Sequence, residues 1–260
     1  MDDRYVGRMW DENAEVWTKL ARTGYDVYRD LVNTPAFLAT LPEVRGLHGL
    51  DIGCGEGNNT RLLVKRGAAM TAVDISETFV RHAQQSESES PLGIHYQLAS
   101  AHRLPFPDET FDFATSFMCL MDMPEPERGI REAFRVLKPG GFLQFSITHP
   151  CFQTPLWKWV RDESGNKIGV VCGQYFNQKP ARVCEWIFSG APEMARKFRI
   201  PVFDRTLSEW INTLLDTGFQ IERMMEPYAD AKTAAEHPDV ADTRHVAYFL
   251  IVRCRKAIRS

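Results

Sequence analysis

The chain has 260 residues, of which 44% are hydrophobic and 25% are charged. This composition is typical of a folded globular protein and not of a disordered, collagenous or fibrous chain. The 31 Lys and Arg residues against 34 Asp and Glu residues give a net charge of −3, without the basic excess that neutralises phosphates, so we expect no nucleic-acid partner.

The cysteines and the apolar runs exclude two further classes. The six cysteines are scattered and form no C-x-x-C pair, so they indicate reduced thiols and neither a zinc ribbon nor a redox motif. No apolar run reaches the roughly 18 to 20 residues of a membrane helix, and Met1-Asp2-Asp3-Arg4 lacks the basic start of a secretory signal. We expect a cytoplasmic protein that does not bind membranes.

Short apolar runs alternate with helical patterns over residues 46–148, which predicts an α/β fold with a parallel sheet. The expected strands are Leu47 to Ile52, Met70 to Ile75, Ile94 to Ala99, Phe111 to Phe117 and Phe142 to Thr148. The expected helices are Thr60 to Arg66, Glu77 to Gln85 and Glu127 to Leu137.

The pattern changes on both sides of this block. Residues 1–45 form an aromatic-rich helical leader, whereas residues 149–200 show no long period and resemble an insertion. In residues 201–260, Thr206 and Glu209 form a capping box for a helix that ends at Gly218. The strands Phe219 to Met224 and Val246 to Cys254 then complete the sheet.

The most informative stretch is Gly53-Cys54-Gly55-Glu56-Gly57, between a strand and a helix. Alternating glycines permit a sharp turn and the close approach of a ligand. Asp74 ends the next strand, where an acid accepts the hydroxyls of a ribose. These features predict a nucleoside-binding site.

Dinucleotides and S-adenosylmethionine both fit such a site. The dinucleotide fingerprint G-x-G-x-x-G requires a glycine where this chain has Asn58. Asp51, just before the loop, is unfavourable beside a pyrophosphate but suits a ligand with an ammonium and a sulfonium. The sequence therefore favours S-adenosylmethionine, and an NAD(P)-dependent oxidoreductase is the weaker alternative.

The stretch Leu50–Gly57 resembles the first motif of class I S-adenosylmethionine-dependent methyltransferases, hydrophobic-Asp-x-Gly-x-Gly-x-Gly. Leu104–Asp112 and Leu137–Gly141 resemble two later motifs of the ubiquinone/menaquinone-methyltransferase-like branch. The resemblance implies a Rossmann-like, seven-stranded, mostly parallel sheet with helices on both faces and an antiparallel seventh strand. It also implies methyl transfer from S-adenosylmethionine to an O, N or C atom of a small organic molecule, leaving S-adenosylhomocysteine. A non-catalytic module that only binds the cofactor remains an alternative.

Carried over by position, the resemblance implies a set of cofactor-binding residues. Gly53, Cys54, Gly55 and Gly57 would hold the methionine part with Asp51 nearby, Asp74 would bind the ribose, and Ile75 and Ala101 would meet the adenine. Family members often have an Asp at the position of Ser100, where it accepts the adenine amino group. Phe117 would lie beside the sulfonium, and Tyr25 and Tyr28 of the leader either reach the cofactor or serve a helix core.

The acceptor side is less defined. His149, directly after the fifth strand, is the candidate general base, or else it caps the strand and anchors the insertion. No histidine pair has metal-ligand spacing with a carboxylate, so we expect no metal. The aromatic residues of the insertion form either a lid over an apolar acceptor or the core of the insertion; they are Phe152, Trp157, Trp159, Tyr175, Phe176, Trp186 and Phe188.

Overall fold

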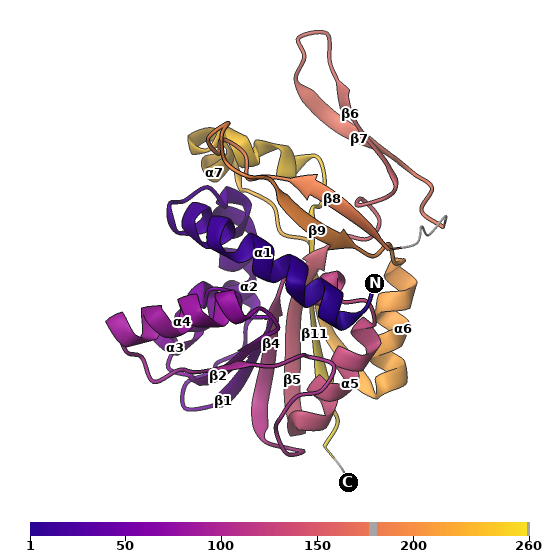
Figure 1. The fold of residues 1–260 in the computed structure, drawn as a ribbon. Helices are drawn as coiled ribbons and strands as arrows, with labels where there is room; N and C mark the ends of the chain where they lie inside the picture. The colour runs from indigo at the N-terminus through magenta and orange to yellow at the C-terminus, as the bar shows by residue number, and fades with distance from the viewer. Residues whose placement is uncertain (177–180, 259–260) are drawn as a thin grey trace.

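The computed structural model describes residues 1–176 and 181–258 of the chain (Figure 1). Its centre is a sheet with the strand order β10-β11-β5-β4-β1-β2-β3. The strands are β1 (His48–Ile52), β2 (Ala69–Asp74), β3 (His95–Leu98), β4 (Phe111–Phe117), β5 (Leu137–Thr148), β10 (Phe219–Met225) and β11 (Phe249–Lys256). In the part of the sheet with the order β5-β4-β1-β2-β3, each strand is parallel to its neighbours. Strand β11 is antiparallel to both β5 and β10. The predicted seven-stranded sheet with an antiparallel seventh strand is confirmed.

Helices cover both faces of this sheet. On one face, α5 (Pro126–Val136) and α6 (Leu207–Thr217) bury Ile130 and Trp210 against the sheet. On the other face lie α2 (Thr34–Thr40), α3 (Asn58–Lys65) and α4 (Glu77–Glu89). Strands buried on both faces are nearly continuous apolar runs, which is why the five strands of the first half were predictable. The remaining helical segments are α1 (Asp3–Arg22), the π-helix η1 (Arg29–Asn33), the 3₁₀ helices η2 (Leu120–Asp122) and η3 (Pro238–Arg244), and α7 (Ala231–Glu236).

The C-terminal ends of the predicted helices agree with the sequence signals to within one residue except in α4, but β5 begins at Leu137, directly after α5, and not at the expected Phe142. The capping box of Thr206 and Glu209 is present, and Gly218 ends α6 in the left-handed conformation with φ of 102°. Helix α4 was predicted to end at Gln85 but continues to Glu89. Its last turn is polar and largely exposed, and because a solvent-facing turn needs no apolar residue, periodicity could not reveal it.

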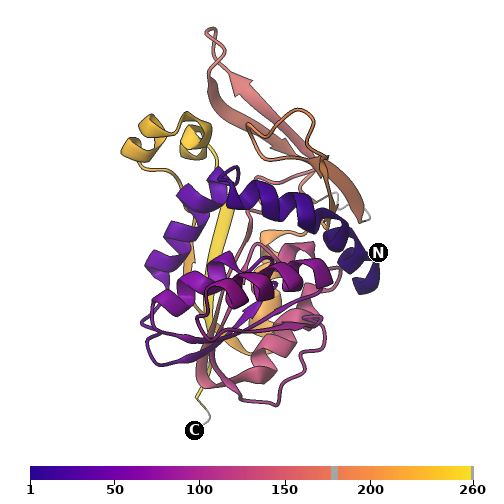
Figure 2. The ribbon, with the colours of Figure 1, turned by 60° about the vertical axis from the view of Figure 1, so that its left-hand side comes forward.

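The leader crosses the carboxyl edge of the sheet as α1, between α4 and the strands of the insertion (Figures 1 and 2). Asp2 caps its start by accepting a hydrogen bond from the Tyr5 N–H at 2.8 Å. Asp11 joins α1 to α4, since its carboxylate accepts from the Ser76 hydroxyl at 2.9 Å and from the Thr78 N–H at 2.8 Å. These contacts hold α1 beside the end of β2.

The insertion contains two antiparallel strand pairs where the sequence showed no regular pattern. Strands β6 (Leu156–Arg161) and β7 (Lys167–Gly173) project from the body, while β8 (Arg182–Trp186) and β9 (Phe198–Val202) lie over α1 (Figures 1 and 2). One face of the β6–β7 hairpin is half-buried and the other is exposed. The exposed face also carries apolar side chains, such as those of Leu156 and Val171, so polarity does not alternate along the strands and the expected signal of a half-buried strand is missing.

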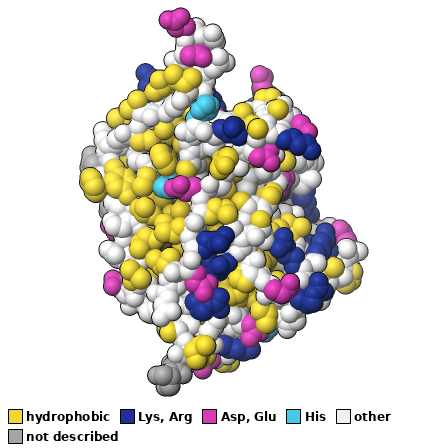
Figure 3. Space-filling model, turned by 180° about the vertical axis from the view of Figure 1, so that it is seen from behind, with side chains coloured by type: hydrophobic (Ala, Val, Ile, Leu, Met, Phe, Trp, Pro, Cys, Tyr) yellow, Lys and Arg dark blue, Asp and Glu magenta, His cyan; other side chains and the backbone are white. Residues whose placement is uncertain are grey.

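The face opposite that of Figure 1 shows basic side chains interspersed with acidic ones (Figure 3). Arg253 and Arg255 of β11, for example, both pair with Glu222 of β10.

Across residues 1–176 and 181–258, no helix combines the length and the apolarity that a bilayer crossing requires.

Candidate active site

A cavity of about 770 Å³ lies where β1, β2 and β4 end, and α1 and the β8–β9 pair form its cover. The volume is within the ~300–1,000 Å³ range of small-molecule sites. Ten of the twelve predicted cofactor-binding residues line it, and the exceptions are Gly57 and Ser100. The ten are Tyr25, Tyr28, Asp51, Gly53, Cys54, Gly55, Asp74, Ile75, Ala101 and Phe117.

The glycine loop is held tightly against the segment that follows β4. Gly53 has φ of 73°, and a Cβ there would lie 2.1 Å from the Cys119 Sγ. Gly55 has φ of 55°, but a Cβ there would meet nothing within 4 Å because this position faces the cavity. Gly57 lies behind the loop against Tyr96 and is the N-cap of α3. The loop therefore needs glycine for packing at position 53 and for ligand access at position 55.

Two buried carboxylates flank this loop. Asp51 accepts hydrogen bonds from the hydroxyls of Thr60 at 2.5 Å and Thr115 at 2.8 Å, and burial raises its pKa to about 6. Asp74 accepts from the Gly55 N–H at 2.8 Å and the Ser76 N–H at 2.9 Å, and burial raises its pKa as well. Each carboxylate oxygen of Asp74 can accept a further bond, so ribose hydroxyls can be bound by an acid that the loop has already positioned.

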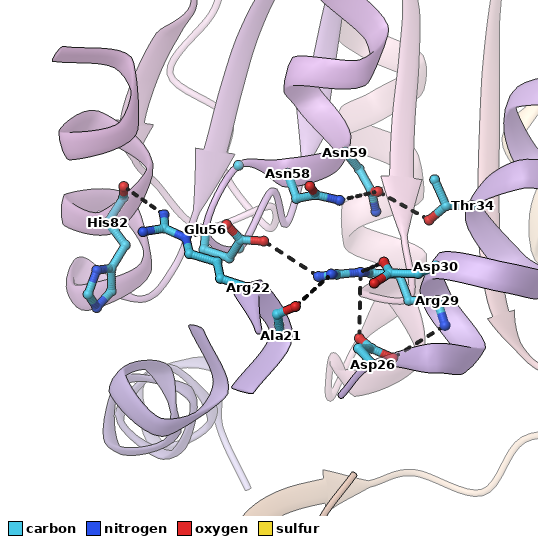
Figure 4. A network of polar contacts seen from close by, with 12 residues as sticks. Ala21, Arg22, Asp26, Arg29, Asp30, Thr34, Glu56, Asn58, Asn59 and His82 are labelled. Carbon is cyan, nitrogen blue, oxygen red and sulfur yellow. Dashed lines mark hydrogen bonds and ion pairs between the residues drawn. The ribbon is translucent and has the colours of Figure 1, made fainter. Parts of the chain in front are cut away.

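A charged network closes the end of the cavity beside the glycine loop (Figure 4). Glu56 pairs with Arg22 at 3.2 Å and with Arg29 at 3.5 Å. Arg29 also contacts Asp30 at 2.7 Å and Asp26 at 3.8 Å, and burial raises the pKa of Asp26 to about 6. Asp26, Arg29 and Glu56 all line the cavity. Paired groups of both signs are suited to a ligand end that carries an ammonium and a carboxylate, as the methionine part of the implied cofactor does.

Ser100 takes part in the site indirectly. Its hydroxyl donates to the carboxylate of Asp3 in the first turn of α1, and Asp3 lines the cavity. The apolar wall beside them is formed by Val6, Ile75 and Ala101. This end of the cavity therefore combines apolar faces with one carboxylate from the leader.

The two leader tyrosines have different surroundings. Tyr28 donates to the Asp242 carboxylate at 2.9 Å, and Tyr248 of the C-terminal region donates to the same carboxylate at 3.2 Å. Lys167 of β7 also pairs with Asp242. Tyr25 packs with the residues that join α1 to the insertion. Both tyrosines line the cavity and also pack or bond within the leader's surroundings, and their contact with the cofactor stays a prediction from the sequence.

The far half of the cavity is covered by the β8–β9 pair. Among the seven aromatic residues considered for a lid, Trp186 and Phe188 line the cavity. Both rings also pack with Trp17 and Phe198 between α1 and the insertion. Phe176 is 85% exposed, and the other four do not line the cavity. The lid therefore consists of two predicted rings and additional residues, which are Ile187, Ile200 and Phe203.

Asp122, at the end of η2, lines the same half of the cavity. Within residues 1–176 and 181–258, its carboxylate has no hydrogen-bond or ion-pair partner. Burial alone holds its pKa well above the usual range. Nearby, burial also raises the pKa of the Cys54 and Cys119 thiols, which favours their neutral form.

His149 is directed away from the cavity. It is 3% exposed, does not line the cavity, and has its Nε2 2.8 Å from a Glu226 carboxylate oxygen. Its Nδ1 accepts from the Cys151 N–H at 3.2 Å. These contacts are those of a residue that anchors the start of the insertion, and its role as a base stays a prediction from the sequence.

Sequence reasoning missed Asp3, Asp26, Arg29, Glu56 and Asp122 as cavity residues. Glu56 had a visible signal, because it lies inside the glycine loop. The leader residues had none, since nothing in their spacing shows where the leader meets the sheet. In the described part of the chain, no three His, Cys, Asp or Glu residues are grouped as metal ligands.

Comparison with known proteins agrees with this geometry. A family model described as a methyltransferase domain matches residues 50–145. The ubiquinone biosynthesis O-methyltransferase of Coxiella burnetii is 35% identical over 149 residues, which are 56% of this chain and 64% of that protein. The chain thus spans just under two thirds of that relative. An uncharacterised protein of Haemophilus influenzae is 26% identical over 95% of both chains.

Solved structures extend the similarity to most of the fold. An S-adenosylmethionine-dependent methyltransferase from Mesorhizobium loti is 29% identical, with a TM-score of 0.72 over 85% of this chain and 96% of that one. S-Adenosylmethionine is the cofactor of the family to which that structure belongs. By its sheet, its glycine loop and these similarities, the chain has the fold of the class I S-adenosylmethionine-dependent methyltransferases and carries a methyltransferase domain over residues 50–145.

Proposed function

We propose that the protein transfers the methyl group of S-adenosylmethionine to a small organic molecule with an apolar body. The observation that carries the proposal is the continuity of the cavity, in which the glycine loop and Asp74 share one space with the lid residues Trp186 and Phe203. A cofactor and an acceptor can therefore meet without crossing solvent. A cytoplasmic location and the lack of a nucleic-acid partner remain predictions from the sequence.

The residues fit the cofactor on three counts. Gly55 leaves open space where a side chain would project, Asp74 is positioned to accept ribose hydroxyls, and Arg29 with Asp26 and Glu56 offers both charges to an amino-acid group. Bound there, S-adenosylmethionine supplies a methyl group on a sulfonium. The protein's part is mainly positioning, which can lower a barrier by ~7 to 11 kcal/mol when both reactants are oriented.

The acceptor half supports a partly apolar substrate with a polar edge. Phe203, Trp210 and Met121 supply apolar walls, while Arg182 pairs with Asp204 at the same surface. The relatives from Coxiella burnetii are O-methyltransferases by name, so an oxygen acceptor is the first class to test.

A hydroxyl or ammonium acceptor must lose a proton when it is methylated. Asp122 is the group that we assign to this step, because its carboxyl lines the acceptor half and is not engaged by another described residue. Burial raises the pKa of Asp122, and a cationic ligand in the same cavity lowers that pKa, which favours the ionised form that can accept a proton.

The test of the function uses cofactor that carries a labelled methyl group, incubated with a metabolite extract and with a panel of small phenols. We expect label in a small-molecule product and tight binding of S-adenosylhomocysteine by calorimetry. Binding without transfer would support the non-catalytic alternative, and binding of NADH instead would support the oxidoreductase.

Asp122→Asn should reduce turnover by ~10²-fold or more, the usual scale of a general base, while S-adenosylhomocysteine affinity stays unchanged. Asp108→Asn is the control, because Asp108 is an exposed acid outside the cavity. Equal turnover of the two variants would remove Asp122 from the mechanism.

A further inference from the structure

The leader places one carboxylate, that of Asp3, beside the cavity wall formed by Val6, Ile75 and Ala101. We infer that Asp3 recognises the exocyclic amino group of the cofactor's adenine, in place of the acid that the family resemblance implies at position 100. The inference rests on the proposed function and assigns the base specificity of the same site to a residue outside the family motifs.

Ser100 positions this carboxylate. Its hydroxyl donates to one Asp3 oxygen and accepts from the His102 N–H at 3.1 Å. Because the only proton of the hydroxyl is engaged by Asp3, the serine itself offers a ligand no donor. Ser100, in the loop after β3, therefore orients the carboxylate of Asp3 in α1, although the two residues are 97 positions apart in the sequence.

His102 makes the same corner polar. Its Nδ1 lies 3.4 Å from the other Asp3 oxygen. Its Nε2 is buried and has no hydrogen-bond partner among the described residues. His102 does not line the cavity, so it supports the Asp3 carboxylate from behind and does not itself meet a ligand.

The start of α1 is fixed closely enough for specific recognition. Asp2 caps the helix: its carboxylate accepts a hydrogen bond from the Tyr5 N–H, which has no acceptor within the helix. Gly7 packs on Ile75, where a Cβ would lie 3.1 Å from the Ile75 Cγ1. Only a residue without a side chain lets α1 approach the end of β2 this closely without displacing Ile75. As a result, Asp3 lies at the rim of the wall that Val6, Ile75 and Ala101 form for a flat base.

The chemistry of the corner distinguishes adenine from hypoxanthine. The 6-amino group of adenine carries two N–H donors, which a carboxylate accepts well. Hypoxanthine presents a carbonyl oxygen at that position, and two acceptors facing each other leave both without a hydrogen bond. Asp3 should therefore favour the adenine compound, and the preference should depend on its charge.

The experiment compares the binding of S-adenosylhomocysteine and S-inosylhomocysteine, in which oxygen replaces the amino group, by calorimetry with the full chain. The unsubstituted protein should prefer the adenine compound by about tenfold or more, the scale of one hydrogen bond to a charged group. Asp3→Asn should bring the ratio close to one. Because the ratio compares two ligands on one variant, a partly unfolded sample does not alter it.

Asp2→Asn is the matched control, since it makes the same change one residue away at an exposed cap and retains a good capping residue. It should keep the preference. A second variant moves the acid to the loop: Asp3→Ser combined with Ser100→Asp should restore the preference that Asp3→Ser alone loses.

An unchanged preference in Asp3→Asn, or no preference in the unsubstituted protein, would overturn the inference while the proposed function stands. If the unsubstituted protein bound neither compound, the proposed function itself would fail, which separates the two results.

Discussion

The glycine loop permits a comparison in which two neighbouring alanine substitutions should fail for different reasons. Both Gly53 and Gly55 have positive φ, but a Cβ at position 53 would lie 2.1 Å from the Cys119 Sγ and 2.5 Å from its Cβ. At position 55 a Cβ would meet nothing within 4 Å and would project into the cavity. Gly53→Ala should therefore lower the stability of the fold, and Gly55→Ala should lower ligand affinity.

The magnitudes follow from the two costs. A left-handed alanine is destabilising by about 1–2 kcal/mol, which both variants share. Gly53→Ala also overpacks the contact with Cys119, which adds ~1–3 kcal/mol, so we expect a total loss of about 2–5 kcal/mol in the free energy of unfolding. Gly46→Ala gives the backbone cost alone, because Gly46 has φ of 77°, open space around a Cβ, and a position outside the cavity.

Urea unfolding measures the first effect and S-adenosylhomocysteine calorimetry the second. Gly55→Ala should resemble Gly46→Ala in stability yet bind the ligand about tenfold more weakly, a loss of ~1.4 kcal/mol. Adding Cys119→Gly to Gly53→Ala removes the atoms that clash and should recover most of the extra loss. Equal stabilities of Gly53→Ala and Gly46→Ala would refute the close contact between the loop and Cys119.

Three further predictions concern buried titratable groups. Asp74→Ala leaves the Gly55 and Ser76 N–H groups without their acceptor, so S-adenosylhomocysteine affinity should fall about tenfold or more; unchanged affinity in calorimetry would overturn the ribose assignment. Burial raises the pKa of Asp26 from 3.8 to about 6, so its contribution to stability is present below pH 3.8 and is lost as the pH rises to about 6. Asp26→Asn should then gain stability relative to the unsubstituted protein between pH 4 and pH 7 in urea unfolding, and parallel curves would contradict the raised pKa. His149→Ala removes a buried partner of Glu226 and should lower stability by ~1–3 kcal/mol with little effect on turnover; the reverse pattern would restore the sequence-based assignment of His149 as a base.

The sheet and the glycine loop were predictable because their causes are local. Strands buried on both faces carry apolar runs whatever lies elsewhere in the chain, and the left-handed conformations at Gly53 and Gly55 are accessible mainly to glycine. Asp74 could be assigned in the same way, because a residue at the carboxyl end of a parallel strand reaches the ligand edge by topology.

The remaining features depend on contacts between distant segments, which local patterns do not encode. The path of α1 decides that Asp3 meets Ser100 and that Arg29 meets Glu56, and the turn after β5 decides that His149 meets Glu226, 77 residues away, and not the cavity. The β6–β7 hairpin gave no signal because its exposed face also carries apolar side chains. The sequence by itself thus determined the sheet and the glycine loop with Asp74 beside it, where backbone conformation and strand order specify each position. Only the tertiary structure decided the adenine corner and the acceptor half, because their walls come from a leader and an insertion whose placement depends on long-range packing.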